Sequence, residues 1–290
     1  MSALFGPAGN SDRFSATYKS SLQAPKWIAG QGLDCYEYQG GKGVNIGEES
    51  ARKLGEAARA AGIRMSLHAP YFINLANPDP ESLEKTANYI LQACFAADCM
   101  GAERVVIHSG ALMKRTRREA LEIAKHSLRQ VVEVCDAAGY GHIALCPETM
   151  GKINQLGDLD EVLELCLLDK RLIPCIDFGH LYARSLGADD GAEAFHKMLD
   201  RVEEMLGAER AGNFHSHFSR IEFTPKGGEK CHRTFDDNGG YGPDWAPLAA
   251  EVARRGWSPT FICESAGTQA EDARVMKDIY LNNLEGVNSK

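Results

Sequence analysis

Long apolar segments are missing from this sequence. No run of apolar residues approaches the roughly 20 that a membrane-spanning helix requires. Residues 1–14, MSALFGPAGNSDRF, also lack the basic start and the long apolar stretch of a secretory signal. We therefore expect a soluble protein that acts in the cytoplasm and has no membrane partner.

Paired cysteines and excess basic charge are also missing. The nine cysteines include no CxxC pair, and an odd number at irregular spacing argues against a disulfide framework. The 32 lysines and arginines are outnumbered by 40 aspartates and glutamates, which gives a net charge of −8. This acidity gives no general support to nucleic-acid binding, although bound metal cations add positive charge that a residue count misses.

No linker, low-complexity tract or internal repeat divides the chain, so we expect a single domain over residues 1–290. Eight short apolar runs alternate with segments of helical spacing, which predicts an α/β fold. Eight strands favour a closed (β/α)8 TIM barrel over its main competitor, a doubly wound open sheet. The Gly- and Pro-rich residues 224–243 are predicted to form a long loop. The expected strands are Ala3–Phe5, Leu33–Tyr38, Arg64–His68, Arg104–His108, His142–Pro147, Ile173–Asp177, Gly212–Phe218 and Thr260–Glu264.

Residues of the kinds that bind metals stand at the ends of these strands. Five consecutive strands, from the third to the seventh, end in His, Glu or Asp, and the eighth ends in Glu. The carboxyl ends of the strands carry the active site in a TIM barrel, so these side chains should converge on one mouth. They are His68, His108, Glu148, Asp177 with His180, His215 with His217, and Glu264.

A mixture of imidazoles and carboxylates is typical of a site for Zn²⁺, with Mn²⁺ or Fe²⁺ as alternatives. Carboxylates crowded together repel each other unless a cation lies between them. Any one of these residues alone is better explained as a structural side chain, such as a hydrogen-bonded histidine or a glutamate in a salt bridge. The repetition at successive strand ends is what predicts a metal centre.

Two motifs resemble those of the endonuclease IV family of apurinic/apyrimidinic endonucleases, within the xylose-isomerase-like barrel superfamily. The first is HxxYxINL, which runs from His68 to Leu75 and includes Tyr71. The second is CIDxxH, from Cys175 to His180. The resemblance extends from about residue 33 to about residue 265, which is nearly the whole expected barrel.

The resemblance implies two or three zinc ions at the mouth, with Glu148 shared between the first two. The first ion would be held by His68, His108 and Glu148. The second would be held by Glu148, Asp177, His215 and Glu264. His180 would belong to a third ion.

The resemblance also implies a DNA-binding role for Tyr71 and Phe72, which match positions that push into DNA at a lesion. An aromatic wedge there would fill the gap left by a missing base, since unstacking costs least where no base is present. The alternative is that the two rings only cover the rim of the barrel.

The sequence departs from the family pattern in two places. The family usually follows its seventh-strand histidine with Leu-Asn-Asp, whereas this chain has His215-Ser216-His217-Phe218. The family's Asp-x-His ligands for the third metal correspond to the region GGEKCHRTF, residues 227–235. Glu229 and His232 are the best substitutes there, with Cys231 as a further candidate.

Our leading hypothesis is a metal-dependent phosphodiesterase that hydrolyses DNA 5′ to abasic sites in base excision repair. Glu148 and Glu264 are the expected catalytic carboxylates, and paired metals would provide hydroxide near neutral pH. Damaged double-stranded DNA is the expected partner, and we expect a monomer without an obligate protein partner. Contacts to the DNA backbone are expected from Arg184, Arg220, Lys226, Lys230 and Arg233, although any one of them alone is better explained as part of an ordinary solvated loop.

A metal-dependent sugar isomerase or epimerase on the same barrel is the alternative hypothesis. Glu148, Asp177, His215 and Glu264 also match the one-metal quartet of such enzymes, in which a carboxylate moves the proton of a hydroxyketone. That hypothesis leaves His68, His108, His180 and His232 without a role. A metal-binding scaffold without activity ranks last, because it leaves so many ligands around one mouth unexplained.

Overall fold

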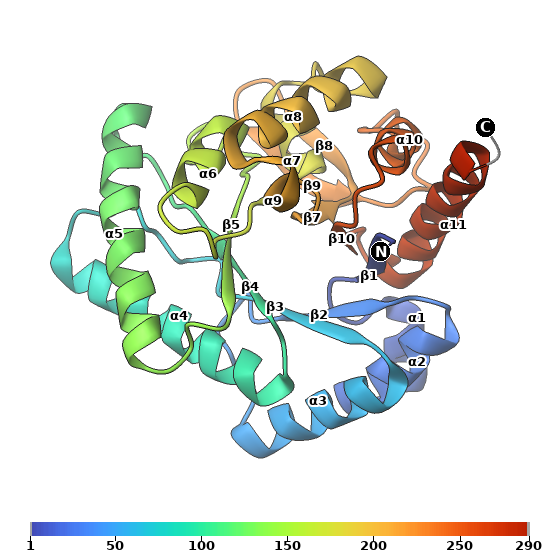
Figure 1. The fold of residues 1–290 in the computed structure, drawn as a ribbon, viewed down its shortest axis with the longest axis horizontal. Helices are drawn as coiled ribbons and strands as arrows, with labels where there is room; N and C mark the ends of the chain where they lie inside the picture. Colours follow the sequence, from blue (N-terminus) through green and yellow to red (C-terminus); the bar gives the residue numbers. More distant parts are fainter. Residues whose placement is uncertain (1, 289–290) are drawn as a thin grey trace.

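The eight predicted strands form one parallel sheet that curves into a nearly closed barrel, which confirms the (β/α)8 TIM barrel (Figure 1). The structure, a computed structural model, describes residues 2–288. The barrel strands are β1 (Leu4–Pro7), β2 (Cys35–Gln39), β3 (Arg64–His68), β4 (Arg104–His108), β5 (Ala144–Glu148), β6 (Cys175–Asp177), β7 (His215–Phe218) and β10 (Thr260–Cys263). Hydrogen-bonded neighbours follow the order β1-β10-β7-β6-β5-β4-β3-β2, and a bridge from Ala8 to Glu37 extends β1 toward β2.

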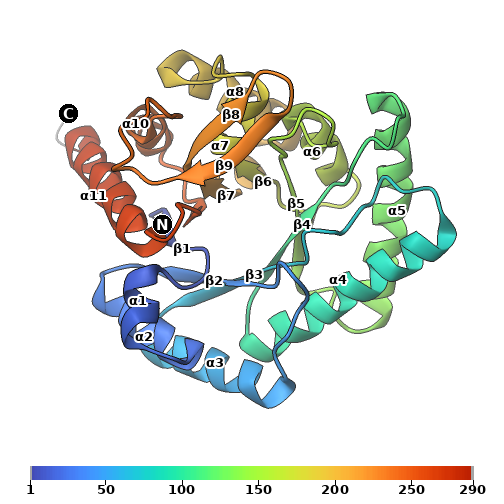
Figure 2. The same cartoon turned by 180° about the vertical axis from the view of Figure 1, so that it is seen from behind.

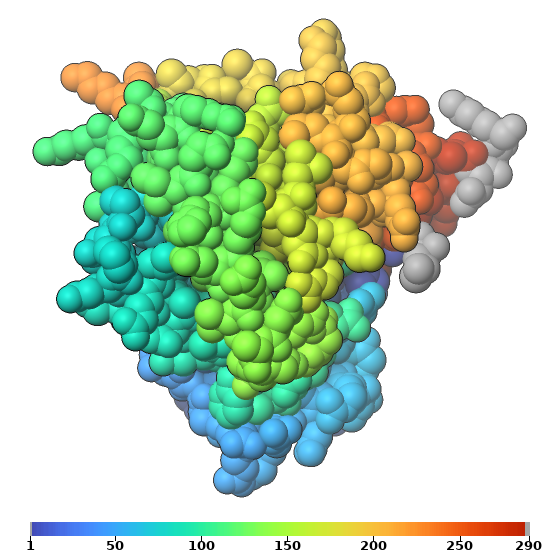
Figure 3. Space-filling view, turned by 60° about the vertical axis from the view of Figure 1, so that its left-hand side comes forward, coloured from blue at the N-terminus to red at the C-terminus, as the bar shows by residue number. Residues whose placement is uncertain are grey.

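Helices surround the barrel and form its outer surface (Figures 1 and 3). They are α1 (Asp12–Thr17), α2 (Ala24–Gly30), α3 (Glu48–Ala61), α4 (Pro80–Met100), α5 (Arg117–Ala137), α6 (Leu159–Cys166), α7 (Phe178–Arg184), α8 (Gly191–Leu206), α9 (Ala208–Ala211), α10 (Trp245–Arg255) and α11 (Gln269–Asn288), with a 3-10 turn at Ser21–Gln23. Within residues 2–288, no helix has both the length and the apolar character needed to cross a membrane.

Local sequence signals set the ends of these helices. Helices α5 and α6 begin with capping boxes, formed by Thr116 with Glu119 and by Asp158 with Glu161. Each box satisfies backbone N–H groups that have no partner inside the helix. Helices α3, α4 and α10 each end at a glycine in the left-handed conformation, which suits a residue without a side chain.

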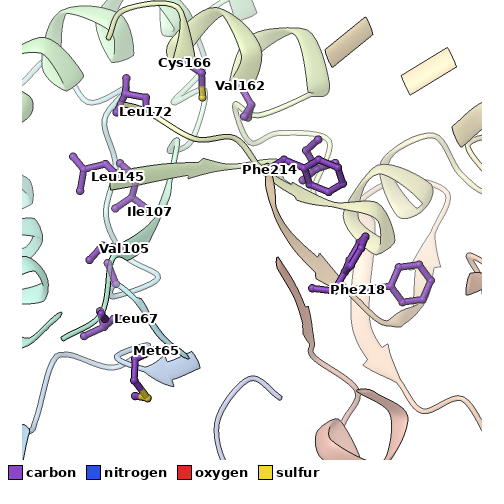
Figure 4. Close-up of a cluster of buried hydrophobic side chains, with 14 of the residues drawn as sticks. Met65, Leu67, Val105, Ile107, Leu145, Val162, Cys166, Leu172, Phe214 and Phe218 are labelled. Carbon is purple, nitrogen blue, oxygen red and sulfur yellow. The ribbon is translucent and has the colours of Figure 1, made fainter. Parts of the chain in front are cut away.

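Successive side chains along each strand point alternately to the hydrophobic core under the helices and to the site inside the barrel. Met65 and Leu67 of β3, and Val105 and Ile107 of β4, point outward and pack under the helices (Figure 4). Their neighbours in sequence point into the barrel, because successive side chains of a strand face opposite sides. Thus His68 faces inward at the end of β3, and the same rule brings ligand-type residues of the other strands into the barrel.

The stretch predicted as a long loop, residues 224–243, is partly ordered into strand, so the prediction of a loop is wrong for this part. Strands β8 (Arg220–Thr224) and β9 (Gly228–Arg233) pair as an antiparallel hairpin. The hairpin contacts α7 beside the ends of β6 and β7 (Figure 2). Gly228 at the turn has a positive φ of 75°, which glycine adopts without steric cost.

Candidate metal centre

The first group of candidate ligands comprises His68, His108 and Glu148. Nε2 of His68 and Nε2 of His108 each lie 3.2 Å from Oε2 of Glu148. The other ring nitrogen of His68, Nδ1, lies 2.7 Å from the carbonyl oxygen of Ala69, and Nδ1 of His108 lies 3.1 Å from the carbonyl oxygen of Tyr71. A proton on Nδ1 that is donated to the carbonyl leaves the Nε2 lone pair directed at the centre. Both rings are therefore oriented as metal ligands.

The second group comprises Glu148, Asp177, His217 and Glu264. One donor atom from each of these four residues lies within 4.8 Å of the others. Nδ1 of His217 is 2.9 Å from Oε1 of Glu148 and 3.6 Å from Oε2 of Glu264. Oδ2 of Asp177 is buried and has no hydrogen-bond partner among residues 2–288. A buried carboxylate oxygen without a donor is costly, and a cation would satisfy it.

His215 was predicted from the sequence to belong to this second group, whereas the structure brings His217 there. Both side chains point into the barrel, because the residues are two positions apart on β7. They differ in depth: His217 pairs in register with Asp177 near the mouth, while His215 pairs with Cys175 one pleat below. Depth along the strand therefore separates the two histidines, and sequence alternation alone does not.

The third group comprises His180, Glu229 and His232, whose donor atoms also lie within 4.8 Å of one another. Nδ1 of His180 is 2.8 Å from the carbonyl oxygen of Thr149, and its Nε2 is 3.6 Å from Oε2 of Glu229. The hairpin supplies the other two side chains. The hairpin can approach this closely because residue 151 is a glycine: a Cβ there would lie only 2.6 Å from the Cβ of Glu229.

Cys231, the further candidate from the same segment, points elsewhere. Its Sγ donates to Oε2 of Glu222 on β8, at 3.5 Å. Cys231 pairs with Glu222 and His232 with Ile221, so these two neighbouring side chains face opposite sides of the hairpin; a bulge between Glu222 and Phe223 shifts the alternation before Glu229. We therefore leave it out of the third group.

Glu148 and His68 favour each other's charged form. Burial alone would raise the pKa of Glu148, but His217, His108 and His68 hold it well below its usual value. Burial alone would lower the pKa of His68, but Glu148 raises it to about 9. Burial raises the pKa of Asp177, and His180 opposes this only in part. This set of imidazoles and buried carboxylates fits a divalent metal such as Zn²⁺.

Glu37 is a candidate residue that the sequence patterns did not reveal. It lies on β2 inside the barrel, fully buried, with oxygens 2.9 Å from Nε2 of His215 and from Nε2 of His217. Burial alone would raise the pKa of Glu37, but these two histidines hold it well below its usual value. The available signal was an acid in the middle of an apolar strand, Cys35–Gln39, between two outward-facing tyrosines.

The two aromatic residues proposed to enter DNA lie on the rim of the mouth. The side chains of Tyr71 and Phe72 are 57% and 43% exposed, and their rings meet edge to face with centroids 5.6 Å apart. Phe72 also packs against Tyr89, with centroids 4.7 Å apart. The carbonyl of Tyr71 accepts from the His108 ring, so the rim and the first group are directly coupled.

Most of the basic residues assigned to DNA contact already have partners inside the protein. Arg184 donates to three backbone carbonyls of the loop after β5. Arg220 donates to the carbonyl of Phe235. Lys230 and Arg233 form ion pairs with Glu222. Arg184 and Arg220 therefore hold loops in place, and Lys226, which is exposed, is the member of the set best placed to meet a phosphate.

A cavity of about 1320 Å³ lies at the opposite end of the barrel, away from the candidate ligands. Its lining has three basic residues, Arg64, Arg104 and Lys277, and three acidic ones, Asp34, Glu103 and Glu209, and two ion pairs join Arg64 with Glu103 and Lys277 with Asp34. Its lining therefore offers no surplus of charge, and the mouth at the carboxyl ends of the strands remains the candidate site.

Comparisons with known proteins agree with this fold and with the resemblance drawn from the two motifs. Residues 25–279 match the model of the xylose isomerase-like TIM barrel family. The uncharacterized protein MJ0133 of Methanocaldococcus jannaschii is 31% identical over 274 residues, which cover 94% of this chain and 96% of that protein. A probable endonuclease 4 of Acholeplasma laidlawii is 27% identical over 165 residues, 54% of this chain and 53% of that protein. The chain thus matches about half the length of that relative.

Solved structures of two different activities share the barrel. Endonuclease IV from Thermus thermophilus superposes with a TM-score of 0.63 at 20% identity, covering 92% of this chain and 95% of that one. A D-tagatose 3-epimerase-like protein gives a TM-score of 0.68 at 20% identity, covering 89% and 90%. At this identity the likeness shows the fold alone, so the choice of activity depends on the site.

Proposed function

Because the chain belongs to the family of xylose isomerase-like TIM barrels, we propose that its three groups of candidate ligands form one hydrolytic metal centre. The substrate that we propose is double-stranded DNA with an abasic site, cut at the phosphodiester bond on the 5′ side of the lesion. Relatives named probable endonuclease 4 support this choice of substrate.

The position of Glu148 between two groups is the observation that carries the proposal. Its Oε2 faces the two histidines of the first group at 3.2 Å, and its Oε1 faces His217 of the second group at 2.9 Å. A carboxylate that directs each oxygen to a different set of imidazoles is suited to bridge two cations. Paired metals are a common arrangement for phosphodiester hydrolysis.

We assign the residues of the centre different roles according to how deeply they are buried in the mouth. Divalent cations, with Zn²⁺ as the first candidate, would supply a water of lowered pKa and positive charge for the reacting phosphate. Glu148 and Asp177 are buried, so they act from below by fixing positions. Among the acids of the second group, Glu264 is the exposed one, with a side chain 15% exposed, so its carboxylate is the one there that can accept a proton from an attacking water.

The aromatic rim supports DNA over a small sugar as substrate. Tyr71 and Phe72 are exposed above the first group, where a flat ring can stack on bases or fill the space of a missing one. A sugar-sized substrate would be enclosed within the mouth and would leave these rings facing water.

A sugar epimerase or isomerase is the second candidate, and one observation favours it. The second group alone supplies four ligands around one position, which is enough for a single cation that polarises a hydroxyketone. This reaction would leave His68, His108 and the whole third group without a role, so we place it second.

Metal content and strand cleavage together test the proposal. We would load the purified protein with Zn²⁺, measure bound metal by elemental analysis, and assay nicking of a duplex oligonucleotide with one tetrahydrofuran abasic site. Wild type should bind two or three ions and cut 5′ to the lesion. Glu264→Gln should reduce cutting by on the order of 100-fold or more, the scale of losing a contact made in the transition state.

Glu103→Gln is the matched control, because Glu103 is a glutamate at the opposite end of the barrel. It should cut at the wild-type rate. An intact duplex in the presence of fully metal-loaded wild type would refute the nuclease proposal. One bound ion, together with epimerisation of a ketohexose, would establish the second candidate instead.

A further inference from the structure

Glu37 lies in the interior of the barrel with every acceptor position of its carboxylate in use. Oε2 accepts from Oγ of Ser66 and from Nε2 of His215, both at 2.9 Å. Oε1 accepts from Nε2 of His217 at 2.9 Å and from Nε2 of Gln39 at 3.1 Å. A carboxylate offers about four such positions. Glu37 therefore has no oxygen free to bind a metal itself, and its chemistry must act through its partners.

Each candidate histidine ligand has one ring nitrogen that faces the centre and one that faces away from it, here called the outer nitrogen, and the partner of the outer nitrogen differs between them. In His68, His108 and His180, Nδ1 lies 2.7, 3.1 and 2.8 Å from a backbone carbonyl oxygen, and Nε2 faces the centre. In His217 the orientation is reversed: Nε2 is the outer atom, Nδ1 faces the centre, and the outer partner is the carboxylate of Glu37. A carboxylate is a stronger acceptor than a carbonyl, because it is charged.

This reversal has a chemical consequence for His217. A neutral imidazole carries one proton, and the nitrogen without it offers the lone pair. With the proton held on Nε2 by Glu37, the lone pair lies on Nδ1, beside the oxygens of Glu148 and Glu264. A carboxylate that accepts from a ligating histidine fixes the ring and increases its basicity.

We propose that Glu37 is a positioning residue for the proposed metal centre: it fixes the tautomer and orientation of His217 and makes this imidazole the strongest neutral donor to the ion of the second group. The inference rests on the proposed metal centre, and it adds a residue that the family motifs in this sequence do not contain. A purely structural role, in which Glu37 only joins β2 to β7, is the competing explanation.

The tautomer can be read in wild type without any substitution. We would label histidine with ¹⁵N, load the protein with ¹¹³Cd²⁺, and record long-range proton–nitrogen spectra. We expect cadmium coupling to Nδ1 of His217 and to Nε2 of His68 and His108. Coupling to Nε2 of His217 would overturn the inference, and so would a failure to bind cadmium and zinc at all.

Substitution tests the contribution of the charge. Glu37→Gln keeps the size of the side chain and removes its charge, whereas Ser66→Ala removes one hydrogen bond to the same carboxylate and leaves the contact with His217. Zinc affinity, measured by competition with a chromophoric chelator, should fall about 10- to 100-fold for one ion in Glu37→Gln. In Ser66→Ala it should stay within about threefold of wild type, because Glu37 keeps its charge and its contacts with both histidines.

The outcomes separate this inference from the proposed function. Equal losses in the two variants, or no loss in Glu37→Gln, would show a structural role and overturn the inference. If Glu37→Gln fails to fold, the spectrum of the wild type decides. Binding of two or three ions with the expected tautomers but no nicking of DNA would refute the nuclease and leave the role of Glu37 intact.

Discussion

Asp177 offers a test in which one substitution should stabilise the metal-free protein and reduce the stabilisation that metal adds. Its Oδ1 accepts from the backbone N–H of His180 at 2.7 Å and caps α7, while Oδ2 is buried without a hydrogen bond among residues 2–288 and lies 3.4 Å from Nδ1 of His180. Asn is as good an N-cap as Asp, so Asp177→Asn keeps the cap. The new amide replaces Oδ2 beside the carboxylates of Glu148 and Glu264, to which it can donate.

Without metal, this substitution should stabilise the protein. It removes a buried acid whose charged form is disfavoured by burial, which raises its pKa. It also removes an unsatisfied acceptor, a defect that costs about 1–3 kcal/mol. We therefore expect the metal-free variant to be more stable than metal-free wild type by about that amount.

With metal, the same substitution should remove most of the stabilisation that zinc gives to wild type. An ion at 1,000 times its dissociation constant stabilises a folded protein by about 4 kcal/mol. At roughly 2–4 °C per kcal/mol, wild type should gain about 8–16 °C in Tm from one such ion. A 100-fold weaker site would lose about 2.7 kcal/mol of this stabilisation. The gain of the variant should therefore fall to about 3–5 °C, using the same conversion.

Thermal melts with excess chelator and with added Zn²⁺ measure both effects on each protein. Asp79→Asn is the matched control, because Asp79 caps α4 through the N–H of Ser82 at 2.9 Å and is exposed. It should change neither melt by more than about 2 °C, since exposed substitutions that keep a cap cost little. An Asp177→Asn protein that is less stable without metal and gains as much as wild type from zinc would refute the reasoning.

Three further predictions concern pH, the rim and the third group. Burial alone would lower the pKa of His68 and His180, but nearby carboxylates raise it to about 9, from 6.5 for a free ring. The stability that these charged pairs add to the metal-free protein should be complete below pH 6.5 and lost as pH rises to about 9, and urea melts that show increasing stability over this range would contradict the prediction. Replacing both Tyr71 and Phe72 by Ala should weaken binding to abasic duplex by on the order of 10- to 100-fold in a gel-shift assay, with unchanged zinc content; unchanged affinity would assign the rings to rim packing. Glu229→Gln should lower the zinc content by one ion and spare the other two, and loss of all ions would show that the groups are not separate sites.

The barrel and most of the centre were predictable from the sequence because two simple periodicities govern them. Alternation along a strand decides which side chains enter the barrel, and the place where an apolar run stops marks its mouth. This was enough to bring His68, His108, Glu148 and Glu264 together. It failed for His215 and His217, because alternation assigns both to the same face and only the register with β6 shows which of them lies level with Asp177.

The hairpin and Glu37 were missed for different physical reasons. The segment Arg220–Arg233 is rich in charge and turn residues, so its strands depend on pairing with each other and on contact with α7 rather than on an apolar face. Glu37 lies within Cys35–Gln39, where the flanking tyrosines suggest an ordinary buried strand. Its role depends on two histidines about 180 residues away in the sequence, and only the closed barrel brings them within 2.9 Å.

The acidic net charge and the proposed DNA substrate are reconciled by where the acids lie. Many acids of the outer helices pair with a base one turn away, as Glu48 does with Arg52 and Glu193 with Lys197. Divalent ions at the mouth would add positive charge where Glu148, Asp177 and Glu264 gather. Under the proposed function, the charge that the phosphate backbone meets would therefore come from the metals rather than from a basic surface. The acids that make the chain unlike a nucleic-acid-binding protein are then the groups that gather the cations needed to hold DNA.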